Sequence, residues 1–304
     1  MLRHQSARGG RVTPVAPAGP DTVTAVAALR GRVGDWRRQS HTTGLVPTMG
    51  ALHEGHFELV RRSLAQCDHT VVSIFVNPTQ FAPHEDFAKY PRNEAADIAG
   101  LAALGVDLVY LPTMQEMYAD GFSTSVTVKR LSEGLCGVTR PHFFLGVATV
   151  VTKLLLQCLP DYAYFGEKDY QQLQVVQRLV RDLDIPVTII GVPTVREPDG
   201  LAFSSRNAYL SATERATAPI MNRVLHQVAT KLRSGEPAPS AAAWGGQQLA
   251  AAGFAPVDYL EVRDPDTLAP IEGPVAPGMK ARIFAAAYLG KTRLIDNIAA
   301  GDGA

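Results

Sequence analysis

Two histidines at the predicted start of a helix are the residues of this chain best placed for chemistry. His53 and His56 stand at the end of the segment LVPTMGALHEGH, residues 45–56. Their spacing of three places both imidazoles on one face of a first helical turn. Each can donate a hydrogen bond to a phosphate oxygen there, beside free backbone N–H groups and the positive end of the helix dipole. The pattern therefore predicts a site for a nucleotide triphosphate.

The same two histidines could instead lie on the surface or ligate a metal ion. The metalloprotease pattern HExxH needs its histidines four positions apart, whereas these are three apart. No third ligand stands nearby in the sequence. A phosphate site is therefore favoured, and we expect no metal ion held by protein ligands.

Amide side chains after a second apolar run could hold a small polar substrate. Asn77 and Gln80 stand in the segment NPTQF, residues 77–81. Amides both donate and accept hydrogen bonds, which suits a carboxylate or a hydroxyl. Asn-Pro also begins many ordinary turns, and a turn is the simpler interpretation of this segment taken alone.

A lysine follows a third predicted strand, AYF. The segment GEKD, residues 166–169, places Lys168 where a cation can meet a phosphate at the strand ends. Gln172 stands one turn into the next predicted helix and faces the same mouth. A solvated turn with Asp169 as the helix cap is the alternative, but it explains the placement of Gly166 and Lys168 less well.

An arginine and two hydroxyls lie together near residue 205. Ser204, Ser205 and Arg206 could clamp a phosphate, because a guanidinium offers a planar fork of donors. An ordinary helix-capping loop is the alternative. The chain contains neither GxxxxGK[ST] nor GxGxxG, so we expect neither a P-loop nor a dinucleotide site.

Strand-like and helix-like runs alternate over the first two thirds of the chain. The predicted strands are 43–48, 70–77, 106–111, 161–165 and 187–192, and the predicted helices are 54–66, 93–104, 147–159 and 170–183. This alternation predicts an α/β fold with a Rossmann-like, doubly wound parallel sheet. Ligands bind at the carboxyl ends of such strands, so the polar segments should converge on one crevice.

The pattern changes after about residue 194. A helical stretch near 212–232, a second helix to about 252, and strand-like runs at 257–264 and 281–290 predict a smaller C-terminal α+β domain. This domain, residues 195–304, could form a lid over the crevice of the Rossmann-like domain, residues 21–194. Residues 1–20 are rich in Gly, Pro, Ala and Arg, and we expect a disordered N-terminal tail.

Composition narrows the class of protein. The chain of 304 residues has 29 basic and 29 acidic residues, and a net charge of zero argues against a nucleic-acid partner. No run of 18 apolar residues is present, so we expect no membrane span. Cys67, Cys136 and Cys158 lie far apart in the sequence. We therefore expect reduced thiols and a cytoplasmic protein.

At these motifs the chain resembles the pantoate–β-alanine ligase family. The resemblance runs from about residue 42 to 298 and rests on PTMGALHEGH, SIFVNPTQF, KYPR, FGEKDYQQL, GVPTVRE, DGLAFSSRN and TRLIDN. It implies a reaction in two steps. Pantoate attacks the α-phosphorus of ATP to give pantoyl adenylate and pyrophosphate, and the amine of β-alanine then displaces AMP to form pantothenate.

The resemblance also implies roles for individual residues. His56 matches the usual acid-type residue and His53 its phosphate partner, and Lys168 and Arg206 complete the catalytic set. Gln80 and Gln172 match the residues that hold pantoate, and Gln80 also serves β-alanine. The ATP site would comprise Met49, Gly50, Ala51, Leu52, His53, Glu54, Gly55, His56, Gly166, Glu167, Lys168, Asp169, Val195, Phe203, Ser204, Ser205 and Arg206. The family uses Mg²⁺ on the triphosphate and forms homodimers.

One motif departs from the family pattern. Members usually have RPGHFRGV where residues 140–147 are RPHFFLGV, so His142 stands one position early and Phe143 takes the usual place of the histidine. The resemblance leaves the role of His142 open.

Three other functions are compatible with the HxGH motif. A small-molecule nucleotidyltransferase would stop at an AMP or CMP conjugate, but the amides of Gln80 and Gln172 favour a carboxylate substrate. An RNA-binding adenylating protein is disfavoured by the neutral net charge. An inactive binding protein is disfavoured by the complete set of polar residues around the motif.

Overall fold

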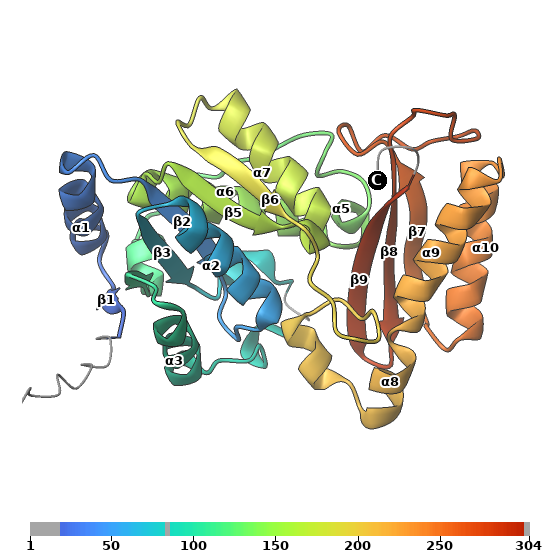
Figure 1. The fold of residues 1–304 in the computed structure, drawn as a ribbon, viewed down its shortest axis with the longest axis horizontal. Coiled ribbons are helices and arrows are strands. Elements are labelled where there is room, and N and C mark those ends of the chain that lie inside the picture. The colour runs from blue at the N-terminus through green and yellow to red at the C-terminus, as the bar shows by residue number, and fades with distance from the viewer. Residues whose placement is uncertain (1–18, 83–85, 301–304) are drawn as a thin grey trace, which may run out of the picture.

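The structure is a computed structural model that describes residues 19–82 and 86–300 (Figure 1). The predicted tail, residues 1–20, therefore lies almost wholly outside the described residues. Within the described ranges, no helix has the length and apolar character needed to cross a membrane.

Six parallel strands form the main sheet. They are β1 (Asp21–Val23), β2 (Thr43–Thr48), β3 (His69–Ile74), β4 (Leu108–Tyr110), β5 (Tyr162–Gly166) and β6 (Thr188–Val192), in the order β1-β4-β3-β2-β5-β6. The strand order reverses between β2 and β5. This topological switch point opens a crevice beyond the carboxyl ends of these two strands. The predicted Rossmann-like, doubly wound sheet is confirmed.

Helices cover both faces of this sheet. One face packs on α1 (Val26–Arg38), α6 (Phe143–Cys158) and α7 (Tyr170–Asp182), and the other packs on α2 (Glu54–Gln66) and α3 (Glu94–Leu104). Successive strand residues therefore enter different cores: Leu45 joins the first cluster and Val46 the second. Burial on both faces explains why these strands are continuous apolar runs.

The smaller C-terminal unit is a three-stranded antiparallel sheet with helices on one face. Strands β7 (Val257–Arg263), β8 (Ala281–Leu289) and β9 (Thr292–Ala300) are ordered β7-β8-β9. Helices α9 (Ile220–Arg233) and α10 (Ala238–Ala251) cover the side away from the main sheet, and α8 (Ala212–Thr217) precedes them (Figure 1). The other side faces the main sheet, where Phe284 packs on Tyr170 with ring centroids 5.9 Å apart. The predicted α+β architecture of this part is confirmed.

Several elements differ from the sequence prediction. Strand β1 and helix α1 are not predicted, since the strand has three residues and the helix is mostly polar. Strand β9 is also missing from the prediction. The predicted helix 212–232 is divided into α8 and α9 at Pro219, which lacks the amide N–H that a continuous helix needs. Helix α6 begins at Phe143 rather than at residue 147.

Short helices complete the described part of the chain. They are the 3₁₀ turns η1 (Pro78–Gln80), η2 (Asp86–Ala88), η3 (Glu167–Asp169) and η4 (Ser205–Tyr209), and the one-turn helices α4 (Met114–Met117) and α5 (Cys136–Thr139).

Candidate active site

A cavity of about 1580 Å³ lies between the main sheet and the small sheet. Its wall includes residues that follow β2, β3, β5 and β6, together with parts of β8 and β9. The topological switch point thus brings together segments that are far apart in the sequence. Many of the predicted site residues line it: Met49, His53, Gly55, His56, Gln80, Gly166, Lys168, Asp169, Gln172, Val195, Phe203, Ser204, Ser205 and Arg206.

The two histidines of the HxGH motif lie against each other at the start of α2. Their ring centroids are 4.0 Å apart, at an interplanar angle of 36°. The backbone N–H of His53 donates to Nδ1 of His56 over 3.3 Å, so the proton of a neutral His56 ring resides on Nε2. Nδ1 of His53 is buried and has no hydrogen-bond partner among the described residues. This nitrogen lies against Gly55, at the start of α2.

Gly55 permits the close packing of the first histidine. A Cβ at this position would lie 3.0 Å from Cε1 and 3.1 Å from Nδ1 of His53. With any larger residue at position 55, the imidazole of His53 would have to shift by a few tenths of an ångström. The glycine between the two histidines thus has a steric reason, which the sequence pattern alone does not reveal.

Burial keeps both imidazoles uncharged. Desolvation lowers the pKa of His53 to about 4, with a further lowering from the positive charge of Lys168 and an opposing effect of Asp169. Desolvation also lowers the pKa of His56 well below 6.5, and His53 and Lys168 add to that shift. At neutral pH each ring is therefore a neutral hydrogen-bond donor, and the charge beside them belongs to Lys168.

Asp97, which the sequence analysis did not single out, holds the turn before α2. Its buried carboxylate accepts from the backbone N–H of Ala51 over 2.9 Å and from that of Leu52 over 2.8 Å. Gly50 and Ala51 have φ angles of +80° and +52°, so the turn is held in the left-handed region. This corrects the expectation that the N–H groups of the turn are free for an anion. The available signal was a lone carboxylate in the apolar run AADIAGLAAL.

In the segment NPTQF, residues 77–81, one amide side chain holds the turn and another lines the cavity. Asn77 caps η1, donates to the carbonyl of Gly146 over 3.2 Å, and accepts from the hydroxyl of Tyr118 over 2.9 Å. Gln80 lies at the end of the same turn and lines the cavity. The guanidinium of Arg140 donates to its backbone carbonyl over 3.0 Å. The turn interpretation therefore holds for Asn77, while Gln80 is available to a ligand.

Gln171 is a second residue that the sequence analysis missed. Its Nε2 donates to the carbonyls of Leu131 and Gly134 over 2.9 and 2.7 Å, and its Oε1 accepts from the backbone N–H of Cys136. This side chain fixes the segment that leads to Arg140. Its neighbour Gln172 lines the cavity, as expected from its place one turn into α7.

Comparison with known proteins identifies the family. The family model described as Pantoate-beta-alanine ligase matches residues 21–299. The chain belongs to this family. The pantothenate synthetase of Paramagnetospirillum magneticum is 58% identical over 276 residues, which are 91% of this chain and 96% of that protein. The resemblance seen in the motifs is confirmed.

Solved structures of pantoate-beta-alanine ligases share the fold. The crystal structure of pantothenate synthetase from Thermus thermophilus is 46% identical, has a TM-score of 0.85, and covers 91% of this chain and 98% of its own. The ligase from Francisella tularensis is 34% identical with a TM-score of 0.78, and the match covers 92% and 97% of the two chains. The latter was solved in complex with beta-gamma ATP and beta-alanine.

The motif that departs from the family pattern turns its histidine outward. His142 is exposed and precedes the first turn of α6, whereas Phe143 lines the cavity. Arg140 lies over the ring of Phe143, with Cζ 4.0 Å from the centroid. In this ligase an aromatic ring stacked on an arginine therefore occupies the wall where family members usually have the histidine.

Some residues of the expected ATP site do not line the cavity. They are Gly50, Ala51, Leu52, Glu54 and Glu167. The carboxylate of Glu54 pairs with Arg61 over 2.6 Å, and that of Glu167 pairs with Arg282 over 3.2 Å. The first three form the turn that Asp97 holds. Their contribution is to fix the shape of the wall.

The lowered pKa of His53 predicts a loss of stability in acid. The unfolded chain binds a proton near pH 6.5, whereas folded His53 does so only near pH 4. The free energy of unfolding should therefore fall as the pH drops below about 6.5, by about 2 kcal/mol at pH 5 from this group alone. Urea unfolding at pH 8 and pH 5 measures the difference, and His53→Gln should reduce it.

The control is His226→Gln, which replaces an exposed histidine of α9. It should leave the pH dependence unchanged. Identical pH dependence in wild type and His53→Gln would contradict the assignment of His53 as a buried, neutral group.

The contacts of Asp97 predict a specific loss of stability. In Asp97→Asn, one partly buried backbone N–H of the turn would face an NH₂ group in place of an acceptor. The free energy of unfolding should drop by about 1–3 kcal/mol, as for other unpaired buried donors. Glu94→Gln is the matched control, because it removes a negative charge from the exposed side of the same first turn of α3. Equal losses in the two variants would show that Asp97 acts only through the helix dipole.

Proposed function

We propose that this chain joins pantoate to β-alanine at the expense of ATP, through pantoyl adenylate. The observation that carries the proposal is the meeting of two residue sets in one cavity. Neutral His53 and His56 lie with Lys168 on one part of the wall, and the amides of Gln80 and Gln172 line the same space. Membership of the pantoate-beta-alanine ligase family supports the same reaction.

The nucleotide is proposed to bind between the HxGH motif and the domain junction. His53 and His56 would donate N–H groups to phosphate oxygens, while Lys168 and Arg206 supply positive charge. Ser205 already bridges the two segments, since its hydroxyl donates to the carbonyl of Ala51 over 3.1 Å. The remaining predicted residues of the wall, from Gly166 to Phe203, would enclose the nucleoside.

Magnesium is proposed to arrive as part of the substrate. In residues 19–82 and 86–300, no group of three His, Cys, Asp or Glu side chains is arranged to hold a metal ion. The cavity wall instead offers neutral imidazoles and cations, which suit the oxygens of a triphosphate. Mg²⁺ would therefore be coordinated mainly by the phosphates, where it neutralises their charge.

The acid and the amine are proposed to bind at the amide side. Gln80 and Gln172 would hold pantoate through its hydroxyl and carboxylate groups, and Gln80 would also contact β-alanine. A carboxylate oxygen of pantoate forms a bond to the α-phosphorus as pyrophosphate leaves. The amine of β-alanine then bonds to the acyl carbon, loses a proton, and AMP leaves with the bridging oxygen.

We further propose that residues 195–304 form a lid domain that closes on the Rossmann-like domain, residues 21–194. Both parts contribute residues to the wall of the cavity, which supports this division.

A homodimer is proposed from the resemblance. A cytoplasmic location is proposed from the three cysteines, which are all free. Light scattering of the protein as it elutes from a size-exclusion column measures the oligomeric state.

An AMP-release assay tests the reaction. With ATP, pantoate and β-alanine present, AMP should accumulate, and omission of any one substrate should abolish it. Pyrophosphate should be released without β-alanine, because the first step precedes the amine. Steady AMP formation in the absence of β-alanine would exclude a ligase and would favour transfer of AMP to another acceptor.

Removal of the His56 imidazole should slow the first step. A preorganised donor at a developing charge contributes about 10²–10³ in rate. His56→Ala should show that loss in pyrophosphate release with β-alanine absent. His142→Ala is the matched control, since this histidine is exposed outside the cavity, and its rate should stay within about twofold of wild type. A loss below about tenfold in His56→Ala would remove this residue from the reacting groups.

A further inference from the structure

The TRLIDN motif lies on β9, in the small domain, and its last two residues point to opposite faces of the sheet. Ala285 pairs with Asp296 and Phe284 with Asn297 across the β8–β9 ladder. Directly opposite residues share a face. Ala285 belongs to the core under α9 and α10, whereas Phe284 packs on Tyr170 of the main domain. Asn297 therefore faces the main domain.

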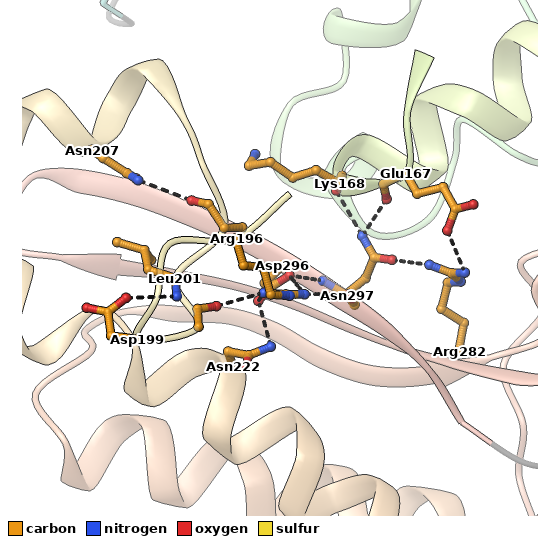
Figure 2. A network of polar contacts seen from close by, with 12 residues as sticks. Glu167, Lys168, Arg196, Asp199, Leu201, Asn207, Asn222, Arg282, Asp296 and Asn297 are labelled. Atoms are coloured by element: carbon orange, nitrogen blue, oxygen red, sulfur yellow. Dashed lines mark hydrogen bonds and ion pairs between the residues drawn. The ribbon is translucent and has the colours of Figure 1, made fainter. Parts of the chain in front are cut away.

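The amide of Asn297 is used completely in contacts with the main domain and with β8. Its Nδ2 donates to the backbone carbonyls of Glu167 and Lys168, both over 2.9 Å (Figure 2). Its Oδ1 accepts from the guanidinium of Arg282, which also reaches the carboxylate of Glu167 over 3.2 Å. With 3% of its surface exposed, Asn297 is a buried link between β9 and the turn η3.

Asp296 makes the corresponding contact on the other face. The carboxylate of Asp296 forms a bidentate ion pair with the guanidinium of Arg196, with N–O distances of 2.7 and 2.9 Å (Figure 2). It also accepts a hydrogen bond from the backbone N–H of Asn297 over 2.8 Å. Arg196 also donates to the carbonyl of Gly200 over 3.0 Å. The pair of residues thus ties β9 to η3 and to the segment that leads to Arg206.

The geometry points to Asn297 as a positioning residue for Lys168. A lysine side chain has four rotatable bonds, so the place of its ammonium group depends on where its backbone is anchored. The carbonyl of Lys168 is one of the two that Asn297 holds. Through this contact the small domain sets the distance between Lys168 and the imidazoles of His53 and His56. The inference rests on the role proposed above for Lys168 in adenylate formation.

The electrostatics of the site agree with this arrangement. The charge of Lys168 contributes to the lowered pKa of both His53 and His56, so the ammonium group lies within electrostatic reach of the pair. A displaced η3 would move that charge away from the phosphates. Displacements of about 1 Å at a reacting centre can cost about 100-fold in rate.

A double-mutant cycle separates positioning from general support of the fold. The rate of pyrophosphate release is measured with saturating ATP and pantoate, without β-alanine, for wild type, Asn297→Ala, Lys168→Ala and the double variant. Asn297→Ala should slow wild type by about 10- to 100-fold. It should slow Lys168→Ala by less than about twofold, because there is no ammonium group left to position.

Two further variants keep the test decisive. Asn297→Asp retains the size of the side chain and the oxygen that accepts from Arg282, but it replaces the donor that faces Glu167 and Lys168, so it should show the same dependence on Lys168. Ile283→Ala is the matched control, because it truncates a fully buried core side chain of the small domain, on the face of the sheet away from η3. It should lower the melting temperature and have the same effect on rate in both backgrounds.

Three results would overturn the inference. If Asn297→Ala and Asn297→Asp each slow Lys168→Ala as much as they slow wild type, Asn297 supports only the fold. A loss of less than about twofold in otherwise wild-type protein would show that it does not position Lys168. If Lys168→Ala itself keeps its rate within about twofold, the proposed role of Lys168 fails and the inference fails with it, whereas the first two results leave that role standing.

Discussion

The site depends on the burial of two imidazoles in an uncharged state beside a lysine. Desolvation is the largest cause of the lowered pKa of both His53 and His56, and Lys168 adds to it. A buried charge without a partner is costly, so the rings remain neutral donors until a negatively charged ligand arrives. Gly55 permits the close packing of His53, and Asp97 holds the turn from which both rings project. The local geometry therefore serves one electrostatic requirement.

The arrangement of the two sheets places these groups around one cavity. The main sheet supplies the HxGH motif after β2 and the lysine after β5, on either side of its switch point. The small domain closes the far side of the cavity with β8 and β9. Phe284 and Tyr170 join the two parts through apolar contact, while Asn297 and Arg282 join them through polar contacts with η3. Such directional contacts fix the relative position of backbone segments more closely than apolar packing does.

Polar groups left without partners mark the points at which this network is incomplete. Within the described residues, Nδ1 of His53 and Nε of Arg282 are buried and unpaired. The first lies against Gly55, at the start of α2. The second belongs to the guanidinium that binds Asn297 and Glu167, next to the ring of Tyr170 at 3.7 Å. The neighbouring aromatic face compensates part of that cost.

The sequence by itself determined the alternation of strands and helices, the parallel sheet, the family and the histidine pair, because these depend on local periodicity and on short motifs. Strand β2 and helix α2 have the predicted bounds, since apolar runs and helical spacing are read within a few residues. Strand β1 and helix α1 were not predicted because neither has a strong apolar periodicity.

Only the tertiary structure decided the contacts of Asp97, Gln171 and Asn297, and the protonation of the histidines. Asn297 reaches carbonyls 129 and 130 positions away, and burial sets the pKa of each ring. Contacts between distant segments and the loss of solvent both arise from packing, which no local pattern in the chain records.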